Sequence, residues 1–220
     1  APERVYSLFD IMKATSEKML NEIYQLTDSQ EIKEMVLKII RAEQSQTKGK
    51  FDYYKYVLKD DLRPIMTGVY HDSGFKVATD CHILVAIKED YDVSELEGKV
   101  LLKDGTIIGQ EKGRFPNWRS VIPDTSRPEY SRVQIDFDKW AELFSNYKAE
   151  KKIGEEKPYV KVGNGYYNVE LFNLFVMAMK RIGTTDFFSV QKFAGVSRNG
   201  EDIAIVTPIN RDYERNCYIF

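Results

Sequence analysis

The chain has 220 residues, with 32 Lys and Arg against 34 Asp and Glu, which gives a net charge of −2. Hydrophobic residues make up 43% and charged residues 30%, which is typical of a globular protein and excludes a disordered or collagen-like chain. The near-neutral balance argues against wholesale coating of nucleic acid but is compatible with a local basic face. No apolar run approaches the roughly 18 residues of a membrane helix, and the first residues lack a signal-peptide profile.

Residues 1–48 are predicted to be helical. Apolar residues recur there at helical spacing in two runs, which are Met19, Leu20, Ile23 and Leu26, and then Ile32, Met35, Val36, Ile39 and Ile40. Between the runs, Thr27-Asp28-Ser29 supplies N-cap chemistry, and Ser29 is expected to begin the second helix. We expect a helical hairpin that packs on the rest of the chain, and a partner-binding helix is the alternative.

Residues 44–50 are polar and aperiodic and are predicted to form a loop or linker. A β-meander is expected next, with strands over residues 65–70, 75–79 and 83–88. The tight turn His71-Asp72-Ser73-Gly74 joins the first two strands, with Gly where a positive φ is expected. Residues 100–102 and 106–108 flank Asp104-Gly105, which indicates a further hairpin.

The second half of the chain mixes helices with short strands. Strands are predicted over residues 132–137, 159–162, 187–193, 195–198 and 203–207. Asp138 is expected to cap a helix that runs to about Lys148. Asn168 is expected to cap a second, strongly apolar helix over residues 169–181, which Gly183 ends. Helices and antiparallel strands thus come in blocks, which predicts an α+β fold and not repeated βαβ units.

Candidate catalytic and metal-binding residues are few. The two cysteines, Cys81 and Cys217, cannot build a disulfide framework and lie in no zinc-type spacing, so we expect a reducing, cytoplasmic location. Cys81 and His82 suggest a nucleophile and a base, but adjacent residues of a strand point to opposite faces. His71 and His82, with Asp72 or Asp80, are a weak signal for a metal site.

Common catalytic motifs are also missing from the sequence, including the phosphate-binding loop, the dinucleotide fingerprint, G-x-S-x-G and H-E-x-x-H. The residues therefore favour a binding protein without a cofactor over an enzyme.

Three segments follow one another in an order that resembles a known family. They are Arg63-Pro64-Ile65-Met66-Thr67-Gly68-Val69, then Val77-Ala78-Thr79-Asp80-Cys81-His82-Ile83-Leu84-Val85-Ala86, then Gly113-Arg114-Phe115-Pro116-Asn117-Trp118-Arg119-Ser120-Val121-Ile122-Pro123. The order resembles the bacterial sliding clamp, the DNA polymerase III beta subunit, with its R-P-x-L-x-G-V, A-T-D-G-H-R-L-A and G-R-F-P-D-Y-R-R-V-I-P segments. The helix over residues 168–181 and the strand Ala204-Ile205-Val206-Thr207-Pro208-Ile209 are similar to the end of the family's chain.

The resemblance implies a DNA-clamp-like organisation in abbreviated form. Residues 51–123 are expected to form a clamp-like domain with middle-domain motifs, and residues 130–210 a second, abbreviated one. The helical segment 1–48 and the tail 211–220 have no counterpart in the family. Cys81 stands where the family's motif has glycine, and Ile83 where it has arginine, so the chain departs from a standard clamp.

The resemblance also implies a non-enzymatic processivity factor. Clamps encircle duplex DNA and tether polymerases and other clients, and their helices offer cations to phosphates without reading the sequence. The residues expected to face DNA are Lys139, Lys148, Lys151, Lys152, Lys180 and Arg181. Alternatively, these cations are solvated helix ends that complement the helix dipole. A chain with fewer domains than a clamp is expected to form a homo-oligomer if it closes a ring.

A hydrophobic cleft that takes short apolar client peptides is the family's second activity. The positions that match it are Thr79, Cys81, His82, Ile83, Leu84, Pro116, Val121, Ile205 and Thr207. Desolvated apolar grooves anchor aromatic and aliphatic side chains, which is the physical basis of such binding. Alternatively, all of these residues pack the sheet, and the chain is a clamp-derived interaction module without DNA encirclement.

The last residues, Asn216-Cys217-Tyr218-Ile219-Phe220, are apolar. One hypothesis is that this tail docks in the client cleft, of its own chain or of a neighbour, as client peptides do. The preferred alternative is an additional edge strand of the fold.

Overall fold

The computed structural model describes residues 8–45, 50–59, 62–209 and 216–220, with side chains in the first range from residue 16 to residue 43. The chain divides into two units. The helical unit comprises residues 1–52 and 101–107, and the sheet unit comprises residues 53–100 and 108–220. No helix in the described ranges is long and apolar enough to cross a membrane.

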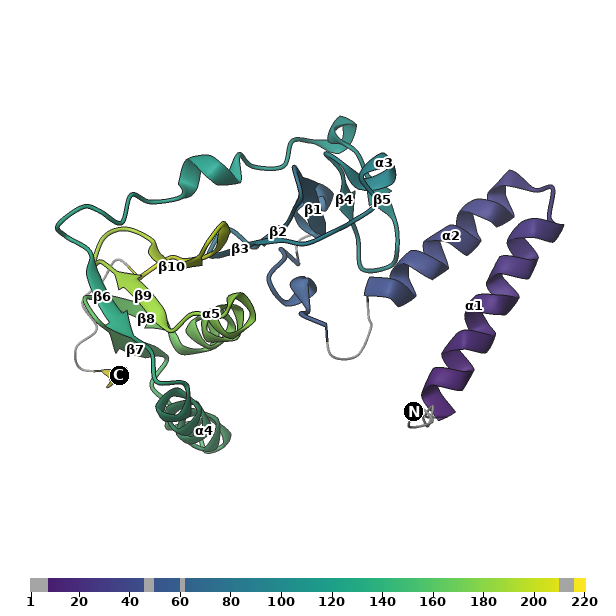
Figure 1. Ribbon diagram of the computed structural model, residues 1–220. Helices are drawn as coiled ribbons and strands as arrows, with labels where there is room; N and C mark the ends of the chain where they lie inside the picture. Colours follow the sequence, from purple (N-terminus) through teal and green to yellow (C-terminus); the bar gives the residue numbers. More distant parts are fainter. Residues whose placement is uncertain (1–7, 46–49, 60–61, 210–215) are drawn as a thin grey trace, which may run out of the picture. The chain divides into compact units, whose positions relative to one another are not determined.

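The helical unit is built on two antiparallel helices, α1 (Leu8–Leu26) and α2 (Gln30–Ser45), as Figure 1 shows. The Ser29 hydroxyl accepts a hydrogen bond from the backbone N–H of Ile32 at 3.4 Å, so Ser29 begins α2 as predicted. The ammonium group of Lys33 lies 5.5 Å from the centre of the Tyr24 ring, which links the two helices. The predicted helical hairpin is confirmed.

The loop 101–107 of the helical unit docks on α2. Asp104 pairs with Lys38 at 3.3 Å, and its side chain accepts the backbone N–H of Thr106 at 2.9 Å. Gly105 has φ +87°, and a Cβ atom built on it would lie 1.9 Å from the carbonyl oxygen of Lys38. Only glycine can bring the loop backbone so close to the helix backbone.

The larger of the two sheets has nine strands in the order β5-β4-β1-β2-β3-β11-β10-β9-β6. Its strands are β1 (Val69–Asp72), β2 (Phe75–Thr79), β3 (Ile83–Lys88), β4 (Val100–Leu101), β5 (Ile107–Ile108), β6 (Ser131–Gln134), β9 (Asp186–Ser189), β10 (Gly195–Asn199) and β11 (Asp202–Val206). The meander β1-β2-β3 and the run β11-β10-β9-β6 are antiparallel throughout. The α+β prediction, with antiparallel sheets and packed helices, is confirmed.

The two halves of this sheet join where β3 pairs with β11. Ile83 lies opposite Val206 and Leu84 opposite Ile205 in an antiparallel register. All four side chains are buried, because the centre of the sheet is covered. Segments far apart in the sequence, and assigned above to two clamp-like blocks, therefore share one continuous sheet.

Helix α5 (Val169–Ile182) packs on the sheet beside α4 (Phe137–Lys152) (Figure 1). The Asn168 side chain caps α5 by accepting the N–H of Leu171 at 3.0 Å, and Gly183 ends the helix at φ 79°, as predicted. The predicted cap of α4 is wrong. The structure has Asp136 at that place, accepting the N–H groups of Asp138 and Lys139, because the chain turns into the helix two residues earlier.

Short helical turns and loops cover the meander. They are η1 (Tyr53–Lys55), η2 (Pro64–Met66), α3 (Val93–Leu96), η3 (Gln110–Lys112) and η4 (Trp118–Val121). Tyr56 is fully buried, and its hydroxyl donates to the Leu174 carbonyl of α5 at 2.7 Å. The strand predicted over residues 65–70 is too long, because Pro64 starts a 3₁₀ turn and β1 begins only at Val69.

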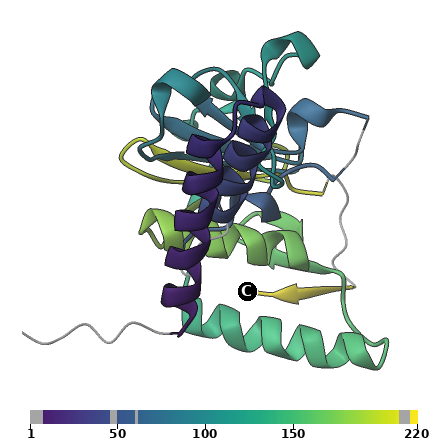
Figure 2. The same cartoon turned by 90° about the vertical axis from the view of Figure 1, so that its right-hand side faces the viewer.

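A second, three-stranded sheet has the order β12-β7-β8 and comprises β7 (Tyr159–Val162), β8 (Gly165–Asn168) and β12 (Cys217–Ile219). β12 pairs in parallel with β7, so the tail is the edge strand that we preferred. Phe220 packs edge-on against Trp140 of α4, with ring centres 5.5 Å apart. Figure 2 shows α4 and α5 in green with β12 in yellow.

Candidate functional site

The turn between β2 and β3 carries the central residues of the predicted client cleft. The Asp80 carboxylate accepts the backbone N–H groups of His82 at 2.8 Å and Ile83 at 2.9 Å. Thr79 donates its hydroxyl to the Ile83 carbonyl at 2.7 Å and accepts the N–H of Cys81 at 3.1 Å. Such side-chain bonds to the backbone hold a turn in one conformation.

Cys81 has φ 76°, a left-handed conformation that costs a residue with a side chain about 1 kcal/mol. The family motif quoted above has glycine at this position, which adopts that conformation without the cost. Cys81 and His82 lie in this turn and not in a strand, so the argument that strand neighbours point to opposite faces does not apply. Both residues are exposed.

The end of β11 lies beside this turn. Thr207 donates both its backbone N–H and its hydroxyl to the carbonyl of His82, at 2.9 and 3.1 Å. The structure therefore brings together the predicted cleft residues of the turn, of β3 and of β11. Ile83, Leu84 and Ile205 are buried in the sheet, so the surface offered here consists mainly of Cys81, His82 and Thr207.

Of the two other predicted cleft residues, Pro116 lies two residues before η4 and Val121 is its last residue, and both are exposed. η4 is fixed at the opposite end of β2, because Trp118 lies 5.3 Å from Phe75 between ring centres. Phe75 and Thr79 are the first and last residues of β2, about 13 Å apart at the usual rise per strand residue. The contacts of η4 thus lie away from the turn at Cys81 and His82.

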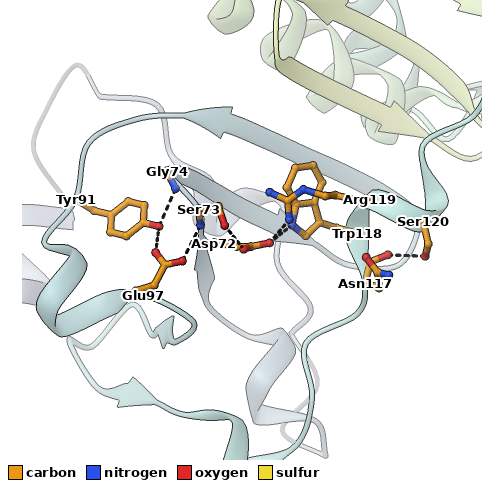
Figure 3. A network of polar contacts seen from close by, with 9 residues as sticks. All are labelled: Asp72, Ser73, Gly74, Tyr91, Glu97, Asn117, Trp118, Arg119 and Ser120. Atoms are coloured by element: carbon orange, nitrogen blue, oxygen red, sulfur yellow. Dashed lines mark hydrogen bonds and ion pairs between the residues drawn. The ribbon is translucent and has the colours of Figure 1, made fainter.

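Asp72 is the anchor of η4, as Figure 3 shows. Its carboxylate accepts the indole N–H of Trp118 at 2.9 Å and forms an ion pair with Arg119. The Arg119 guanidinium stacks on the Trp118 ring, 4.1 Å from its centre. Partial burial alone raises the pKa of Asp72, but the hydrogen bonds from Trp118 and Arg119 outweigh it, and the pKa is lowered.

A second network holds the β1–β2 turn (Figure 3). Tyr91 accepts the N–H of Gly74 at 3.0 Å and donates to Glu97, which also accepts the N–H of Ser73 at 2.8 Å. Burial and the neighbouring Glu97 raise the pKa of Tyr91 to about 12, so its hydroxyl stays protonated and remains a donor. Sequence reasoning missed both networks, because residues from β1, η4 and the segment before β4 meet only in the fold.

His71 is buried among these elements and does not approach a metal-binding arrangement. Its Nδ1 lies 3.3 Å from the Lys99 carbonyl, and its ring packs edge-on against Tyr91. Burial lowers the pKa of His71 to about 4, so the ring is neutral near pH 7. Within the described residues, no cluster of three or more His, Cys, Asp or Glu side chains is placed to hold a metal ion.

The cations predicted to face DNA are exposed on α4 and at the end of α5. Lys151 forms an ion pair with Glu170, and Arg181 pairs with Glu89 at 3.5 Å. Lys148 and Lys180 lie over aromatic rings of α4, each 5.3 Å from the ring centre. Part of the predicted basic surface is therefore engaged by carboxylates and rings of the same unit.

Cavities also lie elsewhere among the described residues of the sheet unit. One, of about 670 Å³, lies along α4 and the tail and is lined by Lys139, Glu150 and Tyr218 among others. Another, of about 510 Å³, lies by β8 and the loop after β9, where Tyr166, Lys192 and Phe193 line it. No sequence motif pointed to either of them.

No protein-family model matches the sequence, and no curated protein matches it. Solved structures do. A proposed DNA polymerase III beta subunit from Eubacterium rectale superposes with a TM-score of 0.51 and 14% identity, covering 79% of this chain and 64% of that chain. A DNA polymerase sliding clamp from Pseudomonas aeruginosa gives 0.48 and 15%, covering 71% and 61%. DNA polymerase III subunit beta from Borrelia burgdorferi gives 0.45 and 12%, covering 82% and 62%.

At such identities, the first of these likenesses shows the fold alone. The chain spans between 61% and 64% of the length of these neighbours. The clamp-like fold expected from the three sequence segments is thus confirmed.

Proposed function

We propose that this chain is a non-enzymatic, clamp-like protein that tethers client proteins to duplex DNA and serves as a processivity factor. The observation that carries the proposal is the continuous antiparallel sheet through β3 and β11, with α4 and α5 beside each other, in a fold similar to a DNA polymerase III beta subunit. We expect a closed ring to be built from several copies, with edge strands pairing between them.

In this proposal, α4 and α5 form the DNA-facing surface. Together the two helices carry six basic and four acidic residues, a modest excess of positive charge. Contacts of Lys148 and Lys152 with phosphates would be independent of sequence and would weaken steeply as salt rises.

The client site of the proposal is the rim formed by Cys81, His82 and Thr207. Thr207 donates two hydrogen bonds to the His82 carbonyl, which hold the end of β11 against the turn. The rim is therefore preorganised for peptide binding. Pro116 and Val121 would extend the site along the sheet. We expect short apolar peptides as ligands, read by their aliphatic and aromatic side chains.

The decisive experiment compares retention on nicked circular duplex with retention on the same DNA after linearisation. We expect the protein to stay on the circle and to slide off the linear form, because only a closed ring is topologically linked. The double variant Lys148→Glu with Lys152→Glu should reduce retention. Its matched control, Lys99→Glu with Lys112→Glu, changes the net charge equally at exposed positions away from α4 and α5 and should retain binding.

A second candidate function is an interaction module that binds proteins without encircling DNA. The ion pairs Lys151–Glu170 and Arg181–Glu89 favour it, because they reduce the charge available to phosphates. Equal behaviour on circular and linear DNA, together with peptide binding that His82→Ala abolishes, would establish this function and refute encirclement.

A further inference from the structure

The helical unit exposes large apolar side chains on both of its helices. They are Met19, Ile23 and Leu26 on α1, at 58%, 44% and 84% exposure, and Ile32, Met35 and Ile39 on α2, at 42%, 58% and 43%. We call these six residues the apolar face. The spacings i, i+4, i+7 on α1 and i, i+3, i+7 on α2 put each set on one stripe of its helix.

The two stripes lie on the same side of the hairpin. On α1, Leu20 and Tyr24 are less exposed, and each directly follows an exposed member of the stripe, Met19 and Ile23. On α2, Val36 and Ile40 follow Met35 and Ile39 in the same way, and Val36 is buried. Each residue advances a helix by about 100°, so each stripe lies about 100° before the less exposed residues that follow it and face the other helix. Because the two helices run antiparallel, this equal offset places both stripes on the same side of the hairpin.

A face of this kind is large for a surface without a partner. Six such side chains at these exposures amount to roughly 600 Å² of apolar area, at the upper end of the largest patch on a typical monomer. Lys38 and the loop 101–107 do not cover it, since the exposures are those with Asp104 paired to Lys38 and Gly105 against the α2 backbone.

The charges that border the face along α1 are self-complementary. Lys18 and Glu22 are exposed and lie on the side of the α1 stripe away from Leu20, about 60–100° from Met19. In an antiparallel contact between two copies of α1, Lys18 of one copy lies opposite Glu22 of the second copy, and the reverse pair forms by symmetry. A parallel contact would place like charges opposite each other.

We propose that a second copy of this chain covers the apolar face, and that two helical hairpins form an antiparallel four-helix bundle around a two-fold axis. The axis would pass near residue 20 of α1 and, at the same level of the hairpin, near Met35 and Val36 of α2. The bundle buries both stripes of both copies and forms two reciprocal ion pairs. The proposal rests on the helical unit alone and does not depend on the DNA-tethering function.

The first test measures the dimer dissociation constant of the full chain by sedimentation equilibrium. Met35→Glu should raise this constant at least about 100-fold, because it buries a charge in the centre of the bundle. Asn21→Glu, on the opposite side of α1, adds the same charge and should leave the constant unchanged. Circular dichroism checks that both variants keep their helices, which is expected since Met35 is exposed in the single chain.

The second test separates self-association from the binding of another partner. Lys18→Glu and Glu22→Lys should each weaken the dimer several-fold, and the double variant should restore it, because the reciprocal pairs are then merely exchanged. In a Cys81→Ser background, Met35→Cys should give a disulfide-linked dimer on oxidation, while Asn21→Cys should not.

Several outcomes would overturn the proposal. One is a chain that stays monomeric at all concentrations. If Met35→Cys in such a monomer is also protected from thiol reagents, the rest of the same chain covers the apolar face. Another is a dimer whose dissociation constant Met35→Glu leaves unchanged. Such a dimer would be formed through strand edges and not through the helical hairpins. Retention on circular DNA is measured separately, so the failure of either proposal can be recognised.

Discussion

Helices α5 and α2 have similar sequence patterns and opposite surroundings. Both place apolar residues at helical spacing, and both have polar residues on the remaining face. On α5, Phe172, Phe175 and Met179 are fully buried, whereas on α2 only Val36 is buried among the described side chains. The difference is that α5 lies on the centre of a nine-stranded sheet, while α2 packs on one helix and one loop of its own unit.

An amphipathic pattern specifies a face to be buried and not the partner that buries it. A sheet offers a broad surface that covers the whole apolar face of a helix. One neighbouring helix covers only about half of such a face, so Met35 and Ile39 remain exposed. The remaining stripe is then available for a further partner.

The largest expected effect is on α5. Phe175→Ala should lower the free energy of unfolding by about 3–5 kcal/mol, since it removes a fully buried ring in contact with Phe172 and Phe187. Urea denaturation monitored by circular dichroism measures the change. Phe193→Ala, at a position 48% exposed, is the matched control and should cost much less. Equal costs would show that α5 is not the centre of the core.

The burial of His71 in the same unit should appear as a pH dependence. The pKa of His71 is about 4 in the folded chain and 6.5 in an unfolded one. Between these pH values, the His71 ring is protonated in the unfolded state and neutral in the folded state. The free energy of unfolding should therefore fall as pH drops from about 6.5 to about 4, by about 3 kcal/mol from this group.

Carboxylates also titrate in this range, so the contribution of His71 is the difference between the parent chain and His71→Gln. His82→Gln is the control for the loss of a histidine side chain, because His82 is exposed. A His71→Gln profile parallel to that of the parent would contradict the buried, neutral state of this ring.

The helical unit should be broken most easily at Gly105. Gly105→Ala should detach the loop 101–107 from α2 at a cost of about 2 kcal/mol or more, because the new Cβ would overlap the Lys38 carbonyl. Gly74→Ala is the matched control, since Gly74 has nearly the same φ, +85°, and open space around it, so only the backbone cost of about 1 kcal/mol remains. Hydrogen exchange of α2 amides, together with urea denaturation, compares the two variants.

The smallest expected effect on the fold is at the apolar face. Met35→Ala should change the free energy of unfolding of the dilute, monomeric chain by less than about 0.5 kcal/mol, because the side chain is 58% exposed there. The same change should be larger at high protein concentration, where the proposed bundle forms. A large loss in the dilute chain would mean that Met35 is buried within one copy, and would end the contrast between α2 and α5.

Several elements could be predicted from the sequence because their signals are local. The bounds of β2 and β3, the Asn168 cap and the Gly183 end of α5 were predicted correctly, and all of them depend on neighbouring residues. The cap of α4 was misplaced because Asp136 and Asp138 carry the same capping group two residues apart. Strand β8 was not predicted, since Gly165 and the aromatic pair after it lack a clear alternation.

The candidate site divides in the same way. The motif around Thr79 and His82 indicated where β2 turns into β3, and the pairing of β3 with β11 places Ile205 and Thr207 beside this turn. The anchoring of η4 by Asp72, through Trp118 and Arg119, had no signal in the sequence. Contacts between residues more than forty positions apart depend on how the strands are arranged in the complete sheet.

Local signals in the chain were enough to predict the class of the fold, the bounds of β2 and β3, the cap and end of α5, and the amphipathic faces that need burial. These properties follow from periodicity, capping and turn chemistry, which act over a few residues. The pairing of β3 with β11, the addition of the tail to β7 and the exposure of the six apolar side chains on α1 and α2 become visible only in the folded structure. Those outcomes depend on which of several distant surfaces packs most favourably against the same partner. A local sequence pattern does not contain this information.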